Sequence, residues 1–117
     1  MLDRYPVTTI RDLFVVSAIL AEVERGGRGA FRRVAARERI RLSLLTEALD
    51  RIEAQIGFKL LETGPSGRRR SVLSPVGDQF RFGASAMVTA WDRAMWNVRE
   101  MASLEGLAEP PPEGRRP

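Results

Sequence analysis

The fold is decided by residues 29–57, GAFRRVAARERIRLSLLTEALDRIEAQIG, because two helical patterns follow one another in this stretch. The first pattern predicts a short helix over about 30–38, and the second predicts a helix over about 42–56 that ends at Gly57. The inner face of the first helix consists of Ala30, Phe31, Val34 and Ala35. The apolar stripe of the second consists of Leu45, Leu49, Ile52 and Ile56, and its opposite side of Ser43, Thr46, Glu47, Asp50 and Ala54. The charged segment 37–41 between them holds neither Gly nor Pro, so periodicity alone does not prove a turn there.

Upstream of this stretch, the spacing of apolar residues predicts another helix over about 10–25. Thr9 is expected as its N-cap, with Asp12 three residues later in the manner of a capping box. The apolar side consists of Ile10, Leu13, Phe14, Leu20 and Val23, with Ser17 at the same spacing. The end of the helix is predicted at a group of glycines, Gly26, Gly27 and Gly29. Residues 1–8 are predicted to be an extended lead-in, because Pro6 disfavours helix there.

Downstream, two short strand-like segments, 58–62 and 71–73, flank the turn-rich basic segment 63–70 and predict a hairpin with a cationic tip. Ser74 and Pro75 then predict the start of a long helix, which we expect to run to about residue 105. The apolar residues of this helix alternate between spacings of four and three, which is typical of a coiled-coil seam and predicts dimerisation. The seam consists of Phe80, Ala84, Met87, Trp91, Ala94, Val98 and Met101.

The composition limits the chemistry that the chain can perform. Its 117 residues, 44% of them apolar, suffice for one domain with a modest core. The absence of Cys and His excludes disulfides, thiolate metal sites and Ser-His-Asp catalysis, and no Gly-rich phosphate loop is present. We interpret the acidic residues as lying among arginines on solvated helix faces, and we therefore expect no enzyme, metal site or cofactor. Met87, Trp91 and Met95 are interpreted as part of the helix seam rather than as a ligand pocket, so no small-molecule ligand is expected. No apolar run of membrane-spanning length and no signal-peptide pattern occur, so we expect a cytoplasmic protein that does not associate with membranes.

The net charge is +4, and the basic residues are distributed unevenly. Seven arginines lie between Arg25 and Arg41 against the single Glu38, and residues 68–70 are a second block of three arginines. Arginine forks onto phosphates and guanine edges, although surface charge also serves solubility alone. The predicted order of three helices, a basic hairpin and a long helix is typical of DNA-binding proteins.

From Gly29 to Gly57 the sequence resembles the N-terminal winged helix-turn-helix domain of LysR-type transcriptional regulators. The residues that match the family pattern without a gap are Gly29, Ala30, Phe31, Arg33, Val34, Ala35, Ile40, Leu45, Thr46, Leu49, Ile52, Glu53, Ile56 and Gly57. Beyond them, residues 60–62 resemble the family's Leu-Phe-Glu strand, and residues 73–77 resemble its entry into the linker helix. The longer, Gly-rich basic wing is similar to that of the molybdate-responsive regulator family.

The resemblance implies a mainly α fold with a winged helix-turn-helix domain over 1–74 and a linker and dimerisation helix over 75–105. The three consecutive prolines near the end predict a disordered tail over 106–117. It also implies a bacterial, nucleoid-associated regulator of transcription that binds double-stranded DNA as a homodimer. The effector-binding domain that the family carries after this helix has no counterpart here. Met1 and the Pro-rich end predict a small protein in its own right rather than a fragment.

The residues expected to contact DNA form three groups. The family reads base edges at the positions occupied here by Leu42, Ser43, Thr46 and Glu47. Phosphates are expected to be held by Arg32, Arg33, Arg41 and Arg51. The wing is expected to contact the backbone or minor groove through Arg68, Arg69 and Arg70.

Three departures from the family pattern concern the DNA sequence preference more than the fold. Residues 41–43 are Arg-Leu-Ser where the family usually has Ser-Gln-Pro, Thr63 replaces an Arg, and Glu38 replaces an apolar turn residue. Two other functions remain open. One is a nucleoid-type protein that binds DNA with weak specificity, and the other is an interaction module whose long helix pairs with a different regulator.

Overall fold

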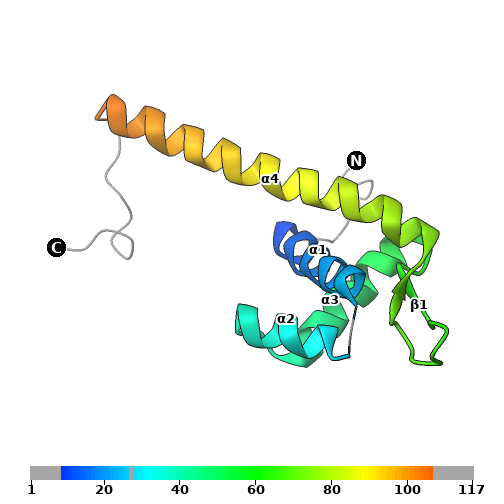
Figure 1. Cartoon of the computed structure of the whole chain (residues 1–117). Coiled ribbons are helices and arrows are strands. Elements are labelled where there is room, and N and C mark those ends of the chain that lie inside the picture. The colour runs from blue at the N-terminus through cyan, green and yellow to red at the C-terminus, as the bar shows by residue number, and fades with distance from the viewer. Residues whose placement is uncertain (1–8, 27, 107–117) are drawn as a thin grey trace.

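The computed structural model describes residues 9–26 and 28–106. It is mainly helical, with a small antiparallel sheet and a long C-terminal helix (Figure 1). The elements in chain order are α1 (Ile10–Arg25), α2 (Ala30–Glu38), α3 (Leu42–Ile56), β1 (Leu61–Glu62), β2 (Val72–Leu73) and α4 (Pro75–Leu104). The predicted helices are confirmed. The lead-in predicted for residues 1–8 and the tail predicted from residue 107 onward lie outside the described residues, and Gly106 is part of a turn.

Side chains cap two of the helices as the sequence predicts. The Thr9 hydroxyl accepts a hydrogen bond from the Asp12 backbone N–H at 3.1 Å, and the Thr9 N–H donates to the Asp12 carboxylate at 3.4 Å. This reciprocal pair is a capping box, which satisfies two backbone donors at the start of α1. At the start of α4 the Ser74 hydroxyl accepts from the Gly77 N–H at 2.9 Å, and Pro75 occupies the first helical turn.

The turn between α2 and α3 depends on a residue that carries no turn signature. Arg39 ends α2 in the left-handed conformation with φ 57°, and Arg41 is extended. The Ile40 N–H donates to the Ala35 carbonyl at 3.0 Å, and the Ile40 side chain packs against the core. Since the left-handed conformation costs about 1–2 kcal/mol for a residue other than Gly, the burial of Ile40 helps to offset it.

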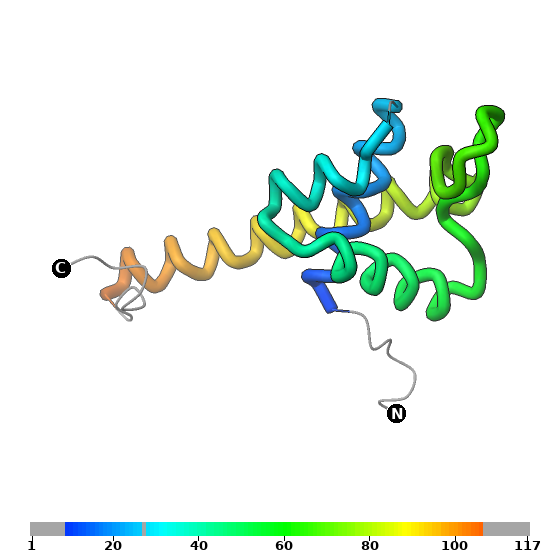
Figure 2. Tube along the Cα trace, turned by 90° about the horizontal axis from the view of Figure 1, so that it is seen from below, coloured from blue at the N-terminus to red at the C-terminus, as the bar shows by residue number. Residues whose placement is uncertain are grey.

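The core is formed where the three short helices meet the segment that enters β1. Its fully buried members include Val16, Ile19, Leu20, Val34, Leu45, Leu49, Ile52 and Leu60. The first part of α4 lies across α1 and adds Val76 and Phe80 to this core. Figure 1 shows that the remainder of α4 extends past the three-helix block. Figure 2 shows that the tip of the hairpin and the C-terminal end of α1 project on the same side of the block.

The two strands are shorter than the sequence predicts, with two residues in each. Leu61 pairs with Leu73 and Glu62 pairs with Val72. On either side of these pairs, the Ser71 N–H donates to the Glu62 backbone carbonyl at 3.0 Å and the Ser74 N–H donates to the Leu60 backbone carbonyl at 2.9 Å. The second of these bonds joins the start of α4 to the root of the hairpin.

Gly77 lies at this junction and leaves no room for a side chain. A Cβ atom at Gly77 would lie 2.1 Å from the Leu60 carbonyl oxygen, which is a backbone atom. The Ser74 hydroxyl also donates to the Lys59 carbonyl at 2.6 Å. The first turn of α4 is therefore in backbone contact with the chain that leads into β1.

Candidate nucleic-acid interface

The outer side of α3 carries the residues predicted to read base edges. Because Leu45, Leu49 and Ile52 are buried, the opposite side of the helix faces away from the core. Leu42, Ser43 and Glu47 are exposed there, and Thr46 is half-buried. The Thr46 hydroxyl donates to the Leu42 carbonyl at 3.4 Å, so its methyl group and hydroxyl both stay close to the helix surface. This side of α3 consequently presents short side chains at its N-terminal half.

The hairpin between the strands is held by local hydrogen bonds. The Ser71 hydroxyl donates to the Arg68 carbonyl at 2.7 Å and accepts from the Gly64 N–H at 3.0 Å. The Gly67 N–H donates to the Gly64 carbonyl at 2.9 Å, which closes the turn. Arg68 and Arg69 are exposed on this hairpin.

A pocket of about 330 Å³ lies between the hairpin, the start of α2 and the start of α3. It is lined by Val23, Gly29, Ala30, Phe31, Arg32, Leu42, Thr46, Arg68, Arg69, Arg70 and Ser71. The predicted contact residues of three separate elements thus lie around one concave surface. Within residues 9–26 and 28–106, no acidic side chain pairs with Arg32, Arg68 or Arg69 of this surface, or with Arg41 at the start of α3. The concave surface therefore carries cationic groups whose charge the described acidic residues do not neutralise.

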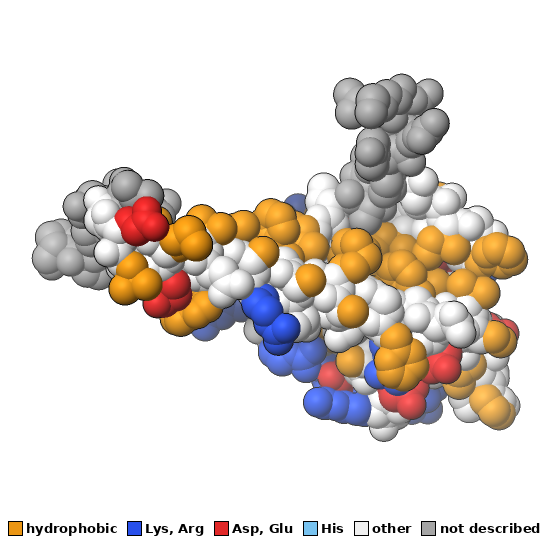
Figure 3. Space-filling model, turned by 90° about the horizontal axis from the view of Figure 1, so that it is seen from above, with side chains coloured by type: hydrophobic (Ala, Val, Ile, Leu, Met, Phe, Trp, Pro, Cys, Tyr) orange, Lys and Arg blue, Asp and Glu red, His pale blue; other side chains and the backbone are white. Residues whose placement is uncertain are grey.

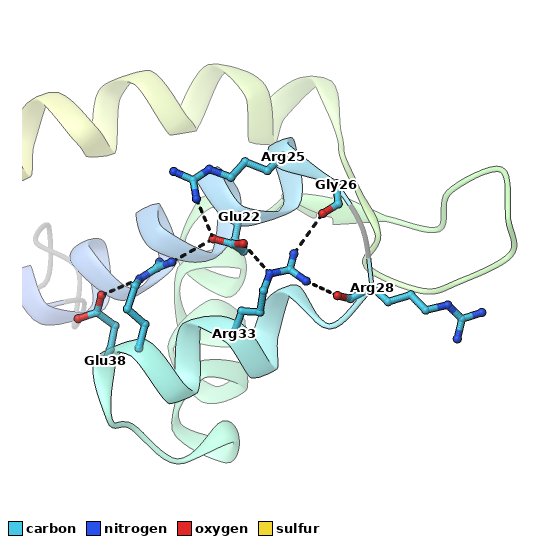
Figure 4. Close-up of polar contacts among 7 residues, drawn as sticks. Glu22, Arg25, Gly26, Arg28, Arg33 and Glu38 are labelled. Atoms are coloured by element: carbon cyan, nitrogen blue, oxygen red, sulfur yellow. Dashed lines mark hydrogen bonds and ion pairs between the residues drawn. The ribbon is translucent and has the colours of Figure 1, made fainter.

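Arg33 has a different environment from the one predicted for a phosphate contact. Its Nε lies 2.6 Å from the Glu22 carboxylate, and its other nitrogens donate to the backbone carbonyls of Gly26 at 3.1 Å and of Arg28 (Figure 4). Arg37 also donates to Glu22 at 3.1 Å, and Arg25 lies 3.7 Å from it. Three arginines thus surround one carboxylate whose side chain is only 7% exposed. Arg33 links α2 to α1 and to the segment between them.

Arg51 and Arg70 are also held by carboxylates rather than left free for phosphates. Arg51 donates two hydrogen bonds to Asp12, at 2.9 and 2.8 Å, which is the bidentate geometry of a strong ion pair. Arg70 donates to Asp50 at 2.7 Å. The outer side of α3 is therefore joined to the start of α1 by one pair and to the hairpin by the other.

The interpretation of all acidic residues as solvated was wrong. Asp12, Glu22 and Glu53 are buried, each beside at least one cationic side chain. Glu53 accepts a hydrogen bond from the Leu60 N–H at 2.8 Å, which fixes the chain before β1. One signal was available for Glu22: it lies within the apolar run of α1 between Leu20 and Val23, where a charge needs partners.

We predict that these ion pairs make stability fall in acid. The arginine beside Asp12, Arg51, lowers the pKa of that carboxyl, and hydrogen bonds from Arg33 and Arg37 lower the pKa of Glu22. Because the pKa values of these carboxyls are lower in the folded than in the unfolded chain, the unfolded chain binds protons first as the pH falls. The contribution is therefore fully present above the ordinary values of 3.8 and 4.5 and is lost below them.

Thermal unfolding followed by circular dichroism from pH 7 to pH 3 measures this effect. The melting temperature should change little down to about pH 5 and then decline. The variants Glu22→Gln and Asp12→Asn should start lower at pH 7 and decline less. A wild-type curve parallel to those of both variants would mean that these two carboxyls do not cause the acid sensitivity.

The predicted seam of α4 has two parts: its first two residues contact the rest of the same chain, and the later ones are exposed. Phe80 is partly buried against the core of its own chain and Ala84 is 1% exposed, so these two predicted seam residues already make contacts within the chain. The distal members are exposed: Met87 by 54%, Trp91 by 48%, and Val98 and Met101 by 62%. Ala94 is exposed between them. Figure 3 shows hydrophobic side chains recurring along the part of α4 that extends from the block.

Comparison with models of known protein families, with curated proteins and with solved structures gives no match to this chain. Among the helices of the described residues, none is both long enough and apolar enough to cross a membrane.

Proposed function

We propose that the chain is a winged helix-turn-helix protein that binds double-stranded DNA as a homodimer and regulates transcription. In this proposal α2 and α3 are the helix-turn-helix, α3 is the recognition helix, and the β1–β2 hairpin is the wing. The observation that carries it is the concave surface at which the start of α2, the outer side of α3 and two exposed wing arginines meet. The resemblance to LysR-type regulators supports the same assignment.

The dimensions and chemistry of this surface suit a DNA duplex. An α-helix of about 10–12 Å diameter fits a major groove that is about 12 Å wide. Short side chains at Ser43 and Thr46 permit a close approach to base edges, and Leu42 offers an apolar contact for a thymine methyl group. Arg41 directly precedes α3, and Arg32 lines the same pocket as Leu42 and Thr46, so both are suited to phosphates beside the groove.

Two acidic residues on the same side of α3 favour specific over weakly specific binding. Glu47 and Asp50 are both exposed there, and negative charge close to phosphates weakens binding to every sequence. A carboxylate is useful on such a surface when it accepts a hydrogen bond from the amino group of cytosine. Asp50 is paired with Arg70, so we assign this role to Glu47.

Selection from randomised double-stranded DNA tests the proposal. Thr46→Ala or Glu47→Ala should weaken binding to the selected site by about 1–3 kcal/mol and relax the preference at one position in each half-site. Binding to random DNA should barely change for Thr46→Ala and should increase for Glu47→Ala, because a negative charge is removed. Gln55→Ala, an exposed change at the other end of α3, is the matched control and should behave as the wild type.

Identical preference profiles for the wild type, Thr46→Ala and Glu47→Ala would contradict readout by α3. A wild type that selects no sequence yet binds random DNA would support the nucleoid-type alternative. No binding to any duplex at low salt would contradict DNA binding and favour the interaction module.

A further inference from the structure

Arg70 differs from its two neighbours in the wing because it is engaged with α3. Its guanidinium lies 2.7 Å from the Asp50 carboxylate and 3.8 Å from that of Glu53. Its side chain is 32% exposed, whereas Arg68 and Arg69 are exposed residues without an acidic partner among the described residues. Asp50 and Glu53 lie three residues apart on α3, so a single wing side chain spans two carboxylates of that helix.

The second of these carboxylates needs a cation. One oxygen of Glu53 accepts from the Leu60 N–H, but the other, Oε1, is buried and has no hydrogen-bond partner among the described residues. The cationic atoms near Oε1 are the Lys59 Nζ at 3.7 Å and the Arg70 Nη2 at 3.8 Å. A buried carboxylate oxygen is costly without compensating charge, and these two cations are the nearest source of it among the described residues.

The root of the wing is fixed by buried Leu61 and by the Ser74–Leu60 hydrogen bond, but the loop beyond the root has little else to fix its direction. Its ladder consists of two residue pairs, and a hairpin this short is marginal in water by itself. The hydrogen bonds of Gly64, Gly67 and Ser71 close the loop internally but do not attach it to α3. Arg70 also has the left-handed conformation with φ 52°, which is unfavourable for a residue with a side chain and is maintained here beside the two α3 carboxylates.

We infer that Arg70 is a positioning residue, which fixes the wing against α3 through Asp50 and Glu53, and that it is not a phosphate contact. The consequence for DNA rests on the proposed function. With the wing fixed, Arg68 and Arg69 are presented beside the recognition helix before DNA arrives, and the cost of ordering the loop on binding is avoided.

Amide hydrogen exchange of the free protein, measured residue by residue by NMR, tests the positioning role without DNA. Arg70→Ala and Asp50→Ala should each speed exchange of the Gly64, Gly67 and Ser71 amides by about two- to fivefold, the factor that a partly exposed ion pair supports. Arg69→Ala removes the same charge one residue away and should leave exchange unchanged.

Exchange that is unchanged in both Arg70→Ala and Asp50→Ala would overturn the inference, as would an equal increase in Arg69→Ala. Binding to a random-sequence duplex over a range of salt concentrations provides a second readout. A positioning role predicts that Arg70→Ala leaves the slope of log K against log salt nearly unchanged, whereas a phosphate contact at Arg70 predicts that this slope flattens by about 1. Should the wild type bind no DNA while the exchange results hold, the positioning role stands and the proposed function fails.

Discussion

Gly77→Ala should lower the free energy of unfolding by on the order of 3 kcal/mol, the largest loss of stability that we expect from a single methyl group. The added Cβ would lie 2.1 Å from the Leu60 carbonyl oxygen and 2.9 Å from its carbonyl carbon. Neither atom can move away easily, because the same carbonyl accepts from the Ser74 N–H and the Leu60 N–H donates to buried Glu53. The clash therefore falls on backbone that is fixed from both sides.

Urea unfolding of Gly77→Ala and Gly83→Ala, compared with the wild type, measures the effect. Gly83 lies in the same helix, and a Cβ atom there has nothing within 4 Å. Gly83→Ala should therefore be neutral or should stabilise by up to about 1 kcal/mol, the difference in helix propensity. Equal stability of the two variants would mean that the contact between Gly77 and Leu60 relaxes without cost.

The second large effect concerns assembly: Met87→Glu combined with Trp91→Glu should convert a dimer into a monomer. The proposed dimer buries the apolar side chains of α4 beyond Ala84, which its own chain leaves exposed. A carboxylate at each of these positions would be buried in the apolar interface of the proposed dimer, which is costly for a charged group. Loss of the second DNA-binding unit should then weaken operator binding by about 100-fold or more.

Light scattering at tens of micromolar measures the assembly state, and DNA titration under the same conditions measures the affinity. Phe82→Glu combined with Trp96→Glu is the matched control, because these residues are 65% and 60% exposed on the same helix. At about 100° per residue they lie on the side of α4 opposite Trp91, so this variant should remain a dimer. A monomeric wild type, or equal dissociation of both variants, would contradict the assigned dimer face.

The helices could be predicted from the sequence because their signals are local. Apolar residues recur with a period of about 3.6 inside each helix. Signals for its ends lie next to it in the sequence: Thr9 caps the start of α1, Gly57 ends α3 and Pro75 begins α4. The turn at Arg39 carries no such signal. Its left-handed conformation is accompanied by packing of Ile40 against the core, and packing of that kind is a property of the folded chain.

The location of the candidate site could be predicted from the sequence. Which of its arginines form ion pairs and which stay free could not be predicted. An arginine that pairs and one that stays free look alike in a sequence, and Arg51 meets Asp12 across 39 positions. The pairs of Arg33 and Arg70 also join elements that are separate in the chain. The same limit applies to α4, whose heptad spacing continues through Phe80 and Ala84 although the chain's own core uses these two residues.

The hydrogen bond between Ser74 and Leu60 and the close backbone contact at Gly77 have a mechanical consequence. The hydrogen bond from Ser74 to the Leu60 carbonyl and the close approach of Gly77 to that carbonyl couple the root of the hairpin to the first turn of α4. In the proposed dimer, a change in the angle at which the two long helices cross would therefore move each hairpin together with its helix. The distance between the two hairpin tips would depend on this crossing angle, and a partner that altered the angle would also change the spacing of half-sites that the proposed dimer can span.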